Sequence, residues 1–435
     1  MNARHLRTLA LAGAATFASL PVASHATEGY FQNGTSARDK GVAGAGIADP
    51  DGAMVLASNP AGIATIDSEV EIGAALFMPR RSFTTAGDPG FTPDGRTESG
   101  SNFFVIPNAA ASFAIDDASS IGIAIYGNGG LNTNWGAPTN NACISPPLPA
   151  SDGVFCGGGT GVDLIQGFVS VGYARSFGDK VSVGVAPVLA LQAFEGRGLA
   201  AFAFDPSGNP LTVDPEALTD NGRDVTVGVG LKVGALIEVS EDFRLAGSYQ
   251  SEIDMGRFDK YAGLFENGGD FDIPSAFQLG AALDVSEKVT VMADYRHINI
   301  EDVPAVANSS TIQQQFGSQG GPGFGWENVD AFKFGVEAQM SDALTLRGGM
   351  AFNNNPVPGS DATINILAPG VSDEHYTLGA RFGSKDSGAF DVSLLYSPTA
   401  RTTGVEITPG GVNPGRTVTL EMRQFEVGVA WSKAL

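Results

Sequence analysis

The sequence has few cysteines, histidines and basic residues, and it lacks any long apolar run. Its 435 residues include 2 cysteines, 4 histidines, and 25 lysines and arginines against 47 acidic residues. So few basic residues argue against nucleic-acid binding, which needs clustered lysine and arginine. No uninterrupted apolar stretch is long enough to span a bilayer as a helix. Disorder is excluded too, because 43% of the residues are hydrophobic.

The first 26 residues have the pattern of a secretory signal peptide. Arg4 and Arg7 form a positive start, an apolar stretch follows from Leu9 to Leu20, and small residues precede Thr27. We expect cleavage after Ala26, so that the mature chain begins at Thr27 and is exported.

Export makes the cysteine pair informative. Cys143 and Cys156 lie in a stretch rich in Pro, Gly and Asn, and an oxidising compartment favours a disulfide between them. The alternative, a metal pair, lacks partners, because after cleavage only His297 and His375 remain and neither is near in sequence. We therefore predict a Cys143–Cys156 disulfide, no metal site and no cofactor.

Alternation of apolar with small or polar residues dominates the rest of the chain. From Val225 to Val239 every second residue is apolar, a period of two that a helix cannot produce. The same period predicts fourteen strands, an even number. They cover residues 69–77, 103–115, 119–126, 162–176, 180–193, 223–239, 243–254, 273–285, 288–301, 329–340, 343–353, 375–383, 389–396 and 417–431.

The connections between these strands alternate in length. Tight turns, such as Asp116-Asp117-Ala118 and Ser240-Glu241-Asp242, alternate with long loops rich in Gly, Pro and Asn. The long loops are expected at 78–102, 127–161, 194–222, 255–272, 302–328, 354–374 and 397–416. Short turns on one side and long loops on the other are typical of outer-membrane barrels. The sequence therefore predicts an all-β protein, a transmembrane antiparallel β-barrel of fourteen strands over residues 67–435.

Residues 27–66 do not alternate and are rich in Gly and Ala. A barrel of fourteen strands has a lumen, and a segment that begins on the turn side is placed to enter it. We expect an N-terminal plug, or hatch, inside the barrel. A phosphate-binding loop is rejected, because no Lys-Ser or Lys-Thr follows the glycines and no βαβ unit surrounds them.

Apolar residues at inward positions are rare and therefore mark a candidate ligand pocket. If the apolar alternates face lipid, the opposite positions face the lumen. The inward apolar residues on this register are Phe104, Ile106, Leu236, Met292, Ile298 and Leu395.

Several short motifs resemble one family of transporters. Asn59-Pro60-Ala61, Ile106-Pro107-Asn108 and the Gly127-Asn128-Gly129-Gly130-Leu131 run, together with Phe352-Asn353-Asn354-Asn355-Pro356, are similar to the FadL-type long-chain fatty acid transporters (the OmpP1/FadL/TodX family). The resemblance covers essentially the whole mature chain. The C-terminus departs from the pattern, since it ends in Trp431-Ser432-Lys433-Ala434-Leu435 rather than in an aromatic residue.

The resemblance implies a ligand-gated lateral route through a plugged barrel. It implies a plug hinge at Asn59, Pro60 and Ala61, and a gate formed by Thr27, Gly29, Tyr30 and Phe31. It also implies a kinked third strand at Gly127, Asn128, Gly129 and Gly130, through which a hydrophobic molecule leaves sideways.

Two long loops carry residues suited to a first, extracellular landing site. Phe258, Tyr261, Leu264 and Phe265 recur at helical spacing and predict an exposed apolar stripe, with Lys260 near enough to meet a carboxylate. The partner loop offers Phe202 and Phe204. The alternative is that the stripe only packs one loop onto the other.

The leading hypothesis is a passive transporter for long-chain fatty acids or similar hydrophobic compounds in the bacterial outer membrane. We expect a monomer that contacts outer-membrane lipid and binds no nucleic acid. An uptake channel for aromatic hydrocarbons is the closest alternative. A general porin and a barrel enzyme are less favoured, because a plug opposes free conduction and only two histidines are available as a base. An adhesin or structural barrel is not excluded by any residue, but it leaves the plug unexplained.

Overall fold

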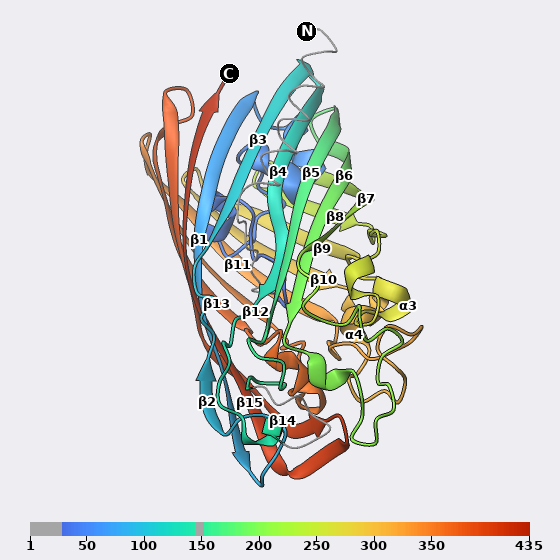
Figure 1. The fold of residues 1–435 in the computed structure, drawn as a ribbon. Helices are drawn as coiled ribbons and strands as arrows, with labels where there is room; N and C mark the ends of the chain where they lie inside the picture. Colours follow the sequence, from blue (N-terminus) through green and yellow to red (C-terminus); the bar gives the residue numbers. More distant parts are fainter. Residues whose placement is uncertain (1–27, 145–151) are drawn as a thin grey trace.

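The computed structural model describes residues 28–144 and 152–435, which form a closed antiparallel barrel (Figure 1). Each of the fourteen wall strands pairs with the next one along the chain, and β1 pairs with β15 to close the wall. The prediction of a fourteen-stranded barrel is confirmed. The fourteen wall strands are β1 (Glu69–Gly87), β3 (Phe104–Asp116), β4 (Ser119–Asn132), β5 (Gly161–Phe177), β6 (Val181–Arg197), β7 (Asp224–Ser240), β8 (Phe243–Gln250), β9 (Ala276–Ser286), β10 (Val289–Ile298), β11 (Val329–Ser341), β12 (Leu344–Asn353), β13 (Glu374–Ser384), β14 (Gly388–Thr408) and β15 (Gly411–Ala434). The predicted signal peptide and Thr27 lie outside the described residues.

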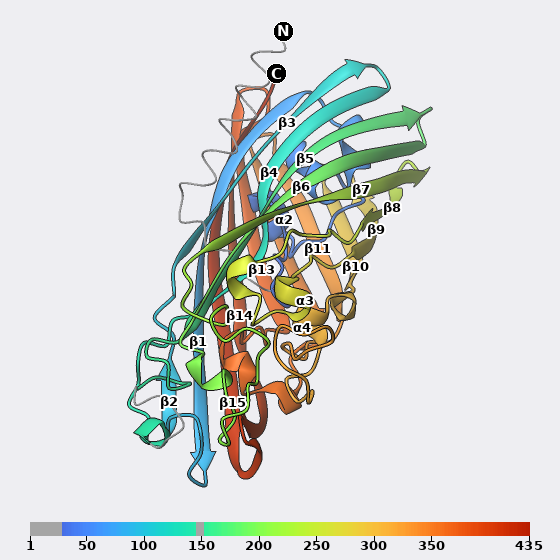
Figure 2. The ribbon, with the colours of Figure 1, turned by 45° about the vertical axis from the view of Figure 1, so that its right-hand side comes forward.

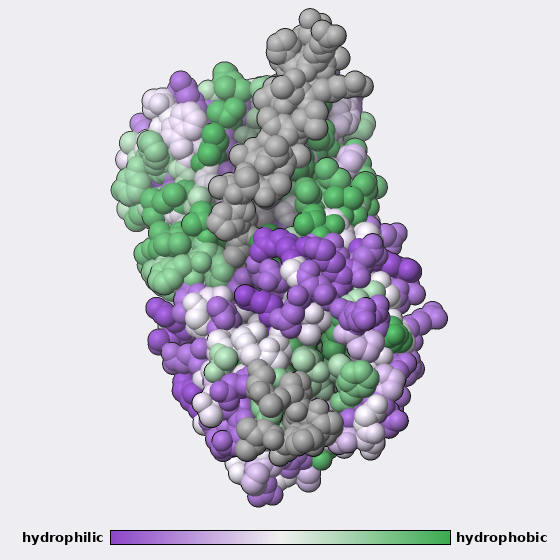
Figure 3. All heavy atoms as spheres, viewed as in Figure 1, coloured by the Kyte–Doolittle hydropathy of each residue, from purple (hydrophilic) through white to green (hydrophobic). Residues whose placement is uncertain are grey.

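The alternation in the sequence becomes the two faces of the wall. On β7, Val225, Val229 and Val233 are exposed on the outside, while Thr226, Gly228 and Lys232 point inward. Figure 3 shows hydrophobic residues gathered on the half of the molecule that carries the short turns and the C-terminus, and hydrophilic residues on the half with the long loops. Within the described part of the chain, every helix is too short or too polar to cross a bilayer.

Two loop predictions were wrong. Residues 78–87 continue β1 and pair with β15 and with the short strand β2 (Gly95–Glu98). Residues 397–416 are mostly strand, because β14 and β15 extend to a tight turn at Pro409-Gly410. The reason is that strands beyond the membrane have water on the outer face, so they need no apolar alternation to form and periodicity does not reveal them.

The segment 28–66 lies inside the barrel in both views (Figures 1 and 2) and is called the hatch below. It contains a short helix, α2 (Ala37–Gly41), and two 3-10 turns, η1 (Ala53–Ala57) and η2 (Pro60–Ala64). Ser36 caps α2 by accepting a hydrogen bond from the Asp39 backbone N–H. Such short elements are not stable alone, so the surrounding wall holds the hatch in shape.

The long loops carry small elements and cover the end of the barrel opposite the short turns (Figure 1). The β12–β13 loop is largely buried, and its Asn365 accepts a hydrogen bond from Trp326 Nε1 of the β10–β11 loop at 2.6 Å. The elements of the loops are η3 (Asn141–Ile144), η4 (Ala200–Phe202), η5 (Asp259–Tyr261), α3 (Glu266–Gly269), η6 (Ile300–Asp302), α4 (Pro304–Ala307), η7 (Gly359–Asp361) and η8 (Ile364–Ile366).

Candidate functional site

The wall is incomplete between β3 and β4. The ladder between them runs from the turn side only as far as the Asn108–Tyr126 pair. Beyond it, β3 still pairs with β1 down to Phe104, and β4 still pairs with β5 up to Asn132, so each strand keeps one neighbour and loses the other. The next residue of β3 toward the long loops is Pro107, and proline has no backbone N–H to donate a hydrogen bond to a neighbouring strand. A gap therefore separates residues 104–107 from residues 127–132.

The gap lies at the height of the apolar belt. Val105 of β3 stands beside it with 54% of its surface exposed on the outer face. On β4, the register to β5 shifts between Gly127 and Gly129, which makes Asn128 a bulge. The predicted kink at Gly127, Asn128, Gly129 and Gly130 thus falls where β4 has lost its partner.

The N-terminal residues 28–32, called the gate below, occupy the free edge of β4. Gly130 donates its backbone N–H to Tyr30 O at 2.9 Å, and Gln32 donates to Asn128 O at 3.4 Å. The Gln32 side chain also donates to Gly127 O. A short piece of the hatch therefore replaces the missing neighbour, and main-chain hydrogen bonds hold it there.

Glycine is required at position 129 for this approach. A Cβ placed on Gly129 would lie 2.4 Å from Tyr30 O, a distance that real Cβ atoms do not show. A Cβ on Gly127 would lie 2.9 Å from Ile106 Cγ2, so the Ile106 side chain fills the gap from the other strand.

Glu28 fixes the far end of the gate by charge. Its fully buried carboxylate pairs with Lys333 of β11 at 2.6 Å and with Arg296 of β10 at 2.9 Å. Glu28 did not enter the sequence prediction. The signal was present, however, because Arg296 and Lys333 fall on inward positions and the second residue of the expected mature chain is acidic.

Residues 36–64 of the hatch, called the hatch body below, contact many strands. Asp51 accepts contacts from Lys385 at 2.7 Å, Arg381 at 2.8 Å and Arg347 at 3.3 Å. On another strand, Asp294 accepts the backbone N–H groups of Gly46 and Ile47 at 3.0 and 3.1 Å.

Asn59, Pro60 and Ala61 pack against two glycines of the wall. Asn59 Nδ2 donates to Ile47 O in the hatch and to Ala235 O of β7, both at 3.2 Å. A Cβ at Gly234 would lie 2.0 Å from Asn59 Oδ1, and one at Gly184 would lie 2.3 Å from the Pro60 carbonyl carbon. The motif that the family resemblance marked as a hinge is thus a fitted contact between the hatch and the wall.

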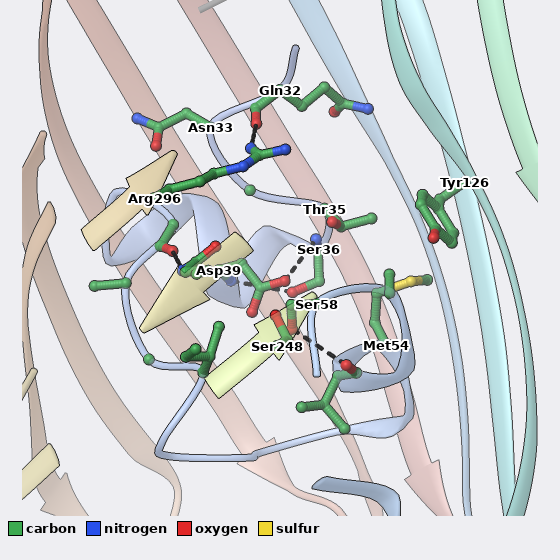
Figure 4. Close-up of a pocket in the computed structure, with 18 of the residues that line it drawn as sticks. Gln32, Asn33, Thr35, Ser36, Asp39, Met54, Ser58, Tyr126, Ser248 and Arg296 are labelled. Carbon is green, nitrogen blue, oxygen red and sulfur yellow. Dashed lines mark hydrogen bonds between the residues drawn. The ribbon is translucent and has the colours of Figure 1, made fainter. Parts of the chain in front are cut away.

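A cavity of about 90 Å³ lies between the hatch and the wall (Figure 4). It is lined by both partners and reaches Gly127 and Asn128 at the gap. Figure 4 shows Gln32 extending toward β4 and the Arg296 side chain donating to the Gln32 carbonyl. Lys232 also lines it and donates to Ala57 O. Within residues 28–144 and 152–435, no carboxylate pairs with Lys232; its amine lies over the Tyr126 ring, and Asp39, Asp51 and Glu71 line the same cavity.

The six residues predicted to line one ligand pocket all point inward and are buried, but they do not lie together. Leu236 and Met292 pack with Val42, Ala45 and Ile47 and seat the hatch body. Phe104, Ile106 and Ile298 belong to a second apolar cluster, and Leu395 belongs to neither. None of the six lines the cavity beside the gate. The pocket prediction is corrected on this point, because a strand register fixes which face a residue is on but not its neighbour across the lumen.

The expectation of an exposed landing stripe was wrong. Phe258, Tyr261, Leu264 and Phe265 are all buried. Tyr261 and Phe265 pack against Phe194 of β6, with ring centroids 4.8 and 4.7 Å apart.

The other residues of the predicted landing site do not restore an apolar surface. Phe202 is half-buried against Phe155, Phe204 is exposed, and the exposed Lys260 donates to Arg223 O at 2.7 Å. The alternative, that the stripe packs one loop onto another, describes the structure.

The loop between β4 and β5 contains the two cysteines, which the structure joins by a disulfide. Both are buried, and the neighbouring Phe155 stacks on Phe91 of the β1–β2 connection, with centroids 5.5 Å apart. The bond therefore holds this loop over the extended β1 hairpin.

One group of carboxylates outside the lumen has the ligand types of a metal site. Glu252, Asp254 and Asp272 approach one another within 4.8 Å near the end of β8. Burial, aided by these like charges, raises the pKa of Asp272 to about 6. No further feature of this loop points to a bound cation, so no ion is assigned.

The two histidines of the mature chain form no catalytic pair with a nucleophile. His297 contacts Asp330 at 2.7 Å and Asn299 at 2.9 Å, which occupies both ring nitrogens. His375, the second residue of β13, points into the barrel and is fully buried. In the described chain, neither ring has the serine or cysteine partner of a hydrolase.

Comparison with known proteins gives a consistent picture. Residues 19–410 match the family model described as outer membrane protein transport protein (OMPP1/FadL/TodX). No curated protein matches the sequence significantly.

Solved structures match along nearly their whole length. The toluene transporter TodX of Pseudomonas putida is 16% identical with a TM-score of 0.66, and the match covers 94% of this chain and 99% of TodX. A FadL homologue of Pseudomonas aeruginosa is 16% identical with a TM-score of 0.65, covering 92% and 99%. The toluene transporter TbuX of Ralstonia pickettii is 14% identical with a TM-score of 0.61, covering 93% and 99%. At these identities the structural match shows the shared fold.

Proposed function

Since the chain belongs to the OmpP1/FadL/TodX family of outer membrane transport proteins, we propose that it takes up long-chain fatty acids or similar molecules by passive, ligand-gated diffusion with lateral exit. Transport of hydrophobic compounds across the outer membrane is the property of the family, and the finer statement is our proposal. We further propose that the signal peptide directs export and that the barrel works as a monomer.

The interrupted β3–β4 ladder is the observation that carries the lateral route. At this gap the β3–β4 ladder stops, and residues 30–32 and the Ile106 side chain lie between the lumen and the apolar belt. A hydrophobic molecule that displaces the gate would meet lipid rather than water. An acyl chain that leaves directly into the apolar layer is not exposed to water, and this exposure would cost about 0.8 kcal/mol per CH₂ group.

The cation at Lys232 favours an acid as the substrate. A buried charge without a counterion is costly, and a carboxylate entering the cavity would compensate it. Lys232→Met should then weaken binding of a fatty acid several-fold and leave binding of toluene unchanged. Equal effects on the two ligands would contradict the acid preference.

Monoaromatic hydrocarbons are the second candidate. They are supported by the similarity to TodX and TbuX, which are described as toluene transporters. A general porin is opposed by the hatch, which fills the lumen, and the family is one of transport proteins rather than enzymes.

Cross-linking the gap tests the route directly. Cysteines at Ile106 and Gly127 would meet across the gap, because a Cβ at 127 lies within 2.9 Å of the Ile106 side chain. The oxidised variant should lose most uptake of radiolabelled oleate by whole cells and regain it after reduction.

The matched control places cysteines at Ala110 and Ala124, which are already paired in the same two strands. Oxidation should leave its uptake unchanged. A second control is the unsubstituted protein with and without reductant, which shows any effect of reducing the Cys143–Cys156 disulfide. Undiminished uptake by the oxidised gap variant would refute lateral exit.

A further inference from the structure

The outer wall of β1, β14 and β15 changes abruptly from apolar to cationic. Met78, Phe425 and Tyr396 are neighbours in register on these strands, and the two rings are exposed on the outside. Phe103 adds a third outward ring with 63% exposure. Rows of aromatic side chains of this kind mark the level at which a barrel leaves the hydrocarbon layer. The next outward positions toward the long loops are Arg80 and Arg423.

Arg80 and Arg423 face each other directly. They are partners in the β1–β15 register, and both are exposed. Like charges opposite each other on neighbouring strands destabilise a sheet. Throughout residues 28–144 and 152–435, neither makes an ion pair, although the chain has 47 acidic residues against 25 basic ones. Arg80 lies over the Phe103 ring at 5.9 Å from its centroid.

A cavity of about 290 Å³ opens beside this pair. Four arginines line it, Arg80, Arg81, Arg96 and Arg423, against the single carboxylate of Glu98. Arg81 is buried, and its Nε has no hydrogen-bond partner. Arg96 is partly compensated by Glu98 and Glu421. The cavity therefore has a net positive charge and free guanidinium donors.

We propose that Arg80, Arg96 and Arg423, called the cationic wall patch below, bind the phosphate groups of the glycolipid of the outer leaflet. Guanidinium groups match phosphate oxygens in a two-pronged geometry. The patch lies just beyond the aromatic row, at the height of lipid headgroups, on the outside of the barrel. A phosphate there would separate two arginines that otherwise repel each other. The patch is outside the lumen, so the proposal does not depend on which molecule is transported.

Titration with purified lipid tests the proposal. Protein in non-ionic detergent is titrated with bis-phosphorylated lipid A and with the same lipid after dephosphorylation, and bound lipid is counted by native mass spectrometry. The unsubstituted protein should prefer the phosphorylated lipid about 25-fold, from roughly fivefold for each of two arginines. Equal binding of the two lipids would overturn the proposal without the use of any variant.

The variant Arg80→Ser/Arg423→Ser should lose that preference. The control is Arg175→Ser, an exposed arginine near the opposite, turn-side end of β5, which should behave like the unsubstituted protein. Retained preference in the double variant would overturn the assignment. Displacement of the lipid by 10 mM inorganic phosphate would mark a site for free anions, and displacement by oleate would mark a landing site for transported acids. Either result would overturn a glycolipid site.

Thermal unfolding provides a second readout. Without lipid, the double variant should melt no lower than the unsubstituted protein, because it removes a repulsion. Phosphorylated lipid A should raise the melting temperature of the unsubstituted protein and of Arg175→Ser, but not that of the double variant. An equal rise in all three proteins would contradict the proposed patch.

Discussion

The gate and the hatch body are attached to the barrel in different ways. The gate, residues 28–32, has one pair of ionic contacts at Glu28 and main-chain hydrogen bonds to the free edge of β4. The hatch body, residues 36–64, has carboxylates surrounded by cations, amides bound to the wall and an apolar seat of its own. Under the proposed lateral route, a ligand would then need to displace only the gate, while the hatch body keeps its contacts with the wall.

The largest effect is expected for Glu28→Gln. Both cationic partners, Lys333 and Arg296, would be left in the lumen without a counterion, and breaking a buried pair costs about 3–5 kcal/mol. Hydrogen exchange of the Gly130 amide should accelerate strongly, because that amide donates to Tyr30 O. Amides of the β14–β15 ladder, such as that of Leu420, are the internal control. Unchanged exchange at Gly130 would show that Glu28 does not hold the gate.

Asp51→Asn is expected to act on the body rather than on the gate. The carboxylate meets Arg381, Lys385 and Arg347, but it is 21% exposed, so the cost should be at the lower end for a buried pair, about 3 kcal/mol. The melting temperature should fall, and proteolysis within residues 36–64 should increase. Asp386→Asn, an exposed neighbour of Lys385, is the control. If Asp51→Asn also deprotects the Gly130 amide as strongly as Glu28→Gln does, the gate and the body move as one unit.

Asn59→Ala should have an intermediate effect. The substitution removes two donated hydrogen bonds and one accepted bond, and it leaves buried partners unsatisfied at a cost of about 2 kcal/mol. Uptake should fall while the barrel keeps its resistance to heat and detergent. Asn209→Ala, on an exposed loop, should leave uptake intact. Normal uptake by Asn59→Ala would remove this contact from the gating mechanism.

Gly129→Ala should have the smallest effect on stability and a selective effect on the gate. The new Cβ would press on Tyr30 O, which overpacks the contact by about 1–2 kcal/mol. Exchange of the Gly130 amide should rise about tenfold with no change in melting temperature. In Gly348→Ala the nearest atom lies 3.8 Å away, so that variant should be neutral. Equal exchange in the two variants would mean that the gate does not need glycine at position 129.

The wall was predictable, but the contacts across the lumen were not. Period two located all fourteen wall strands, because each residue of a lipid-facing strand has one of two environments. Glu28 and Lys232 were not predicted as site residues, since their roles depend on groups roughly 300 and 175 positions away in the chain, at Arg296, Lys333 and Ala57. The stripe at Phe258 and Phe265 was misjudged, because helical spacing shows that residues share a face but not what covers that face.

The sequence alone determined a closed barrel with a non-alternating segment before its first strand, because each residue of a lipid-facing strand points either to lipid or to the lumen and the sequence alternates accordingly. The family motifs predicted a plug hinge at Asn59 and a strand kink at Gly127 to Gly130. Only the tertiary structure showed that the β3–β4 ladder stops at Tyr126 and that residues 30–32 take its place. Only the tertiary structure showed that Arg80 and Arg423 lie opposite each other on neighbouring strands. Strand register and lumen contacts join distant residues, and no local pattern specifies which of them meet.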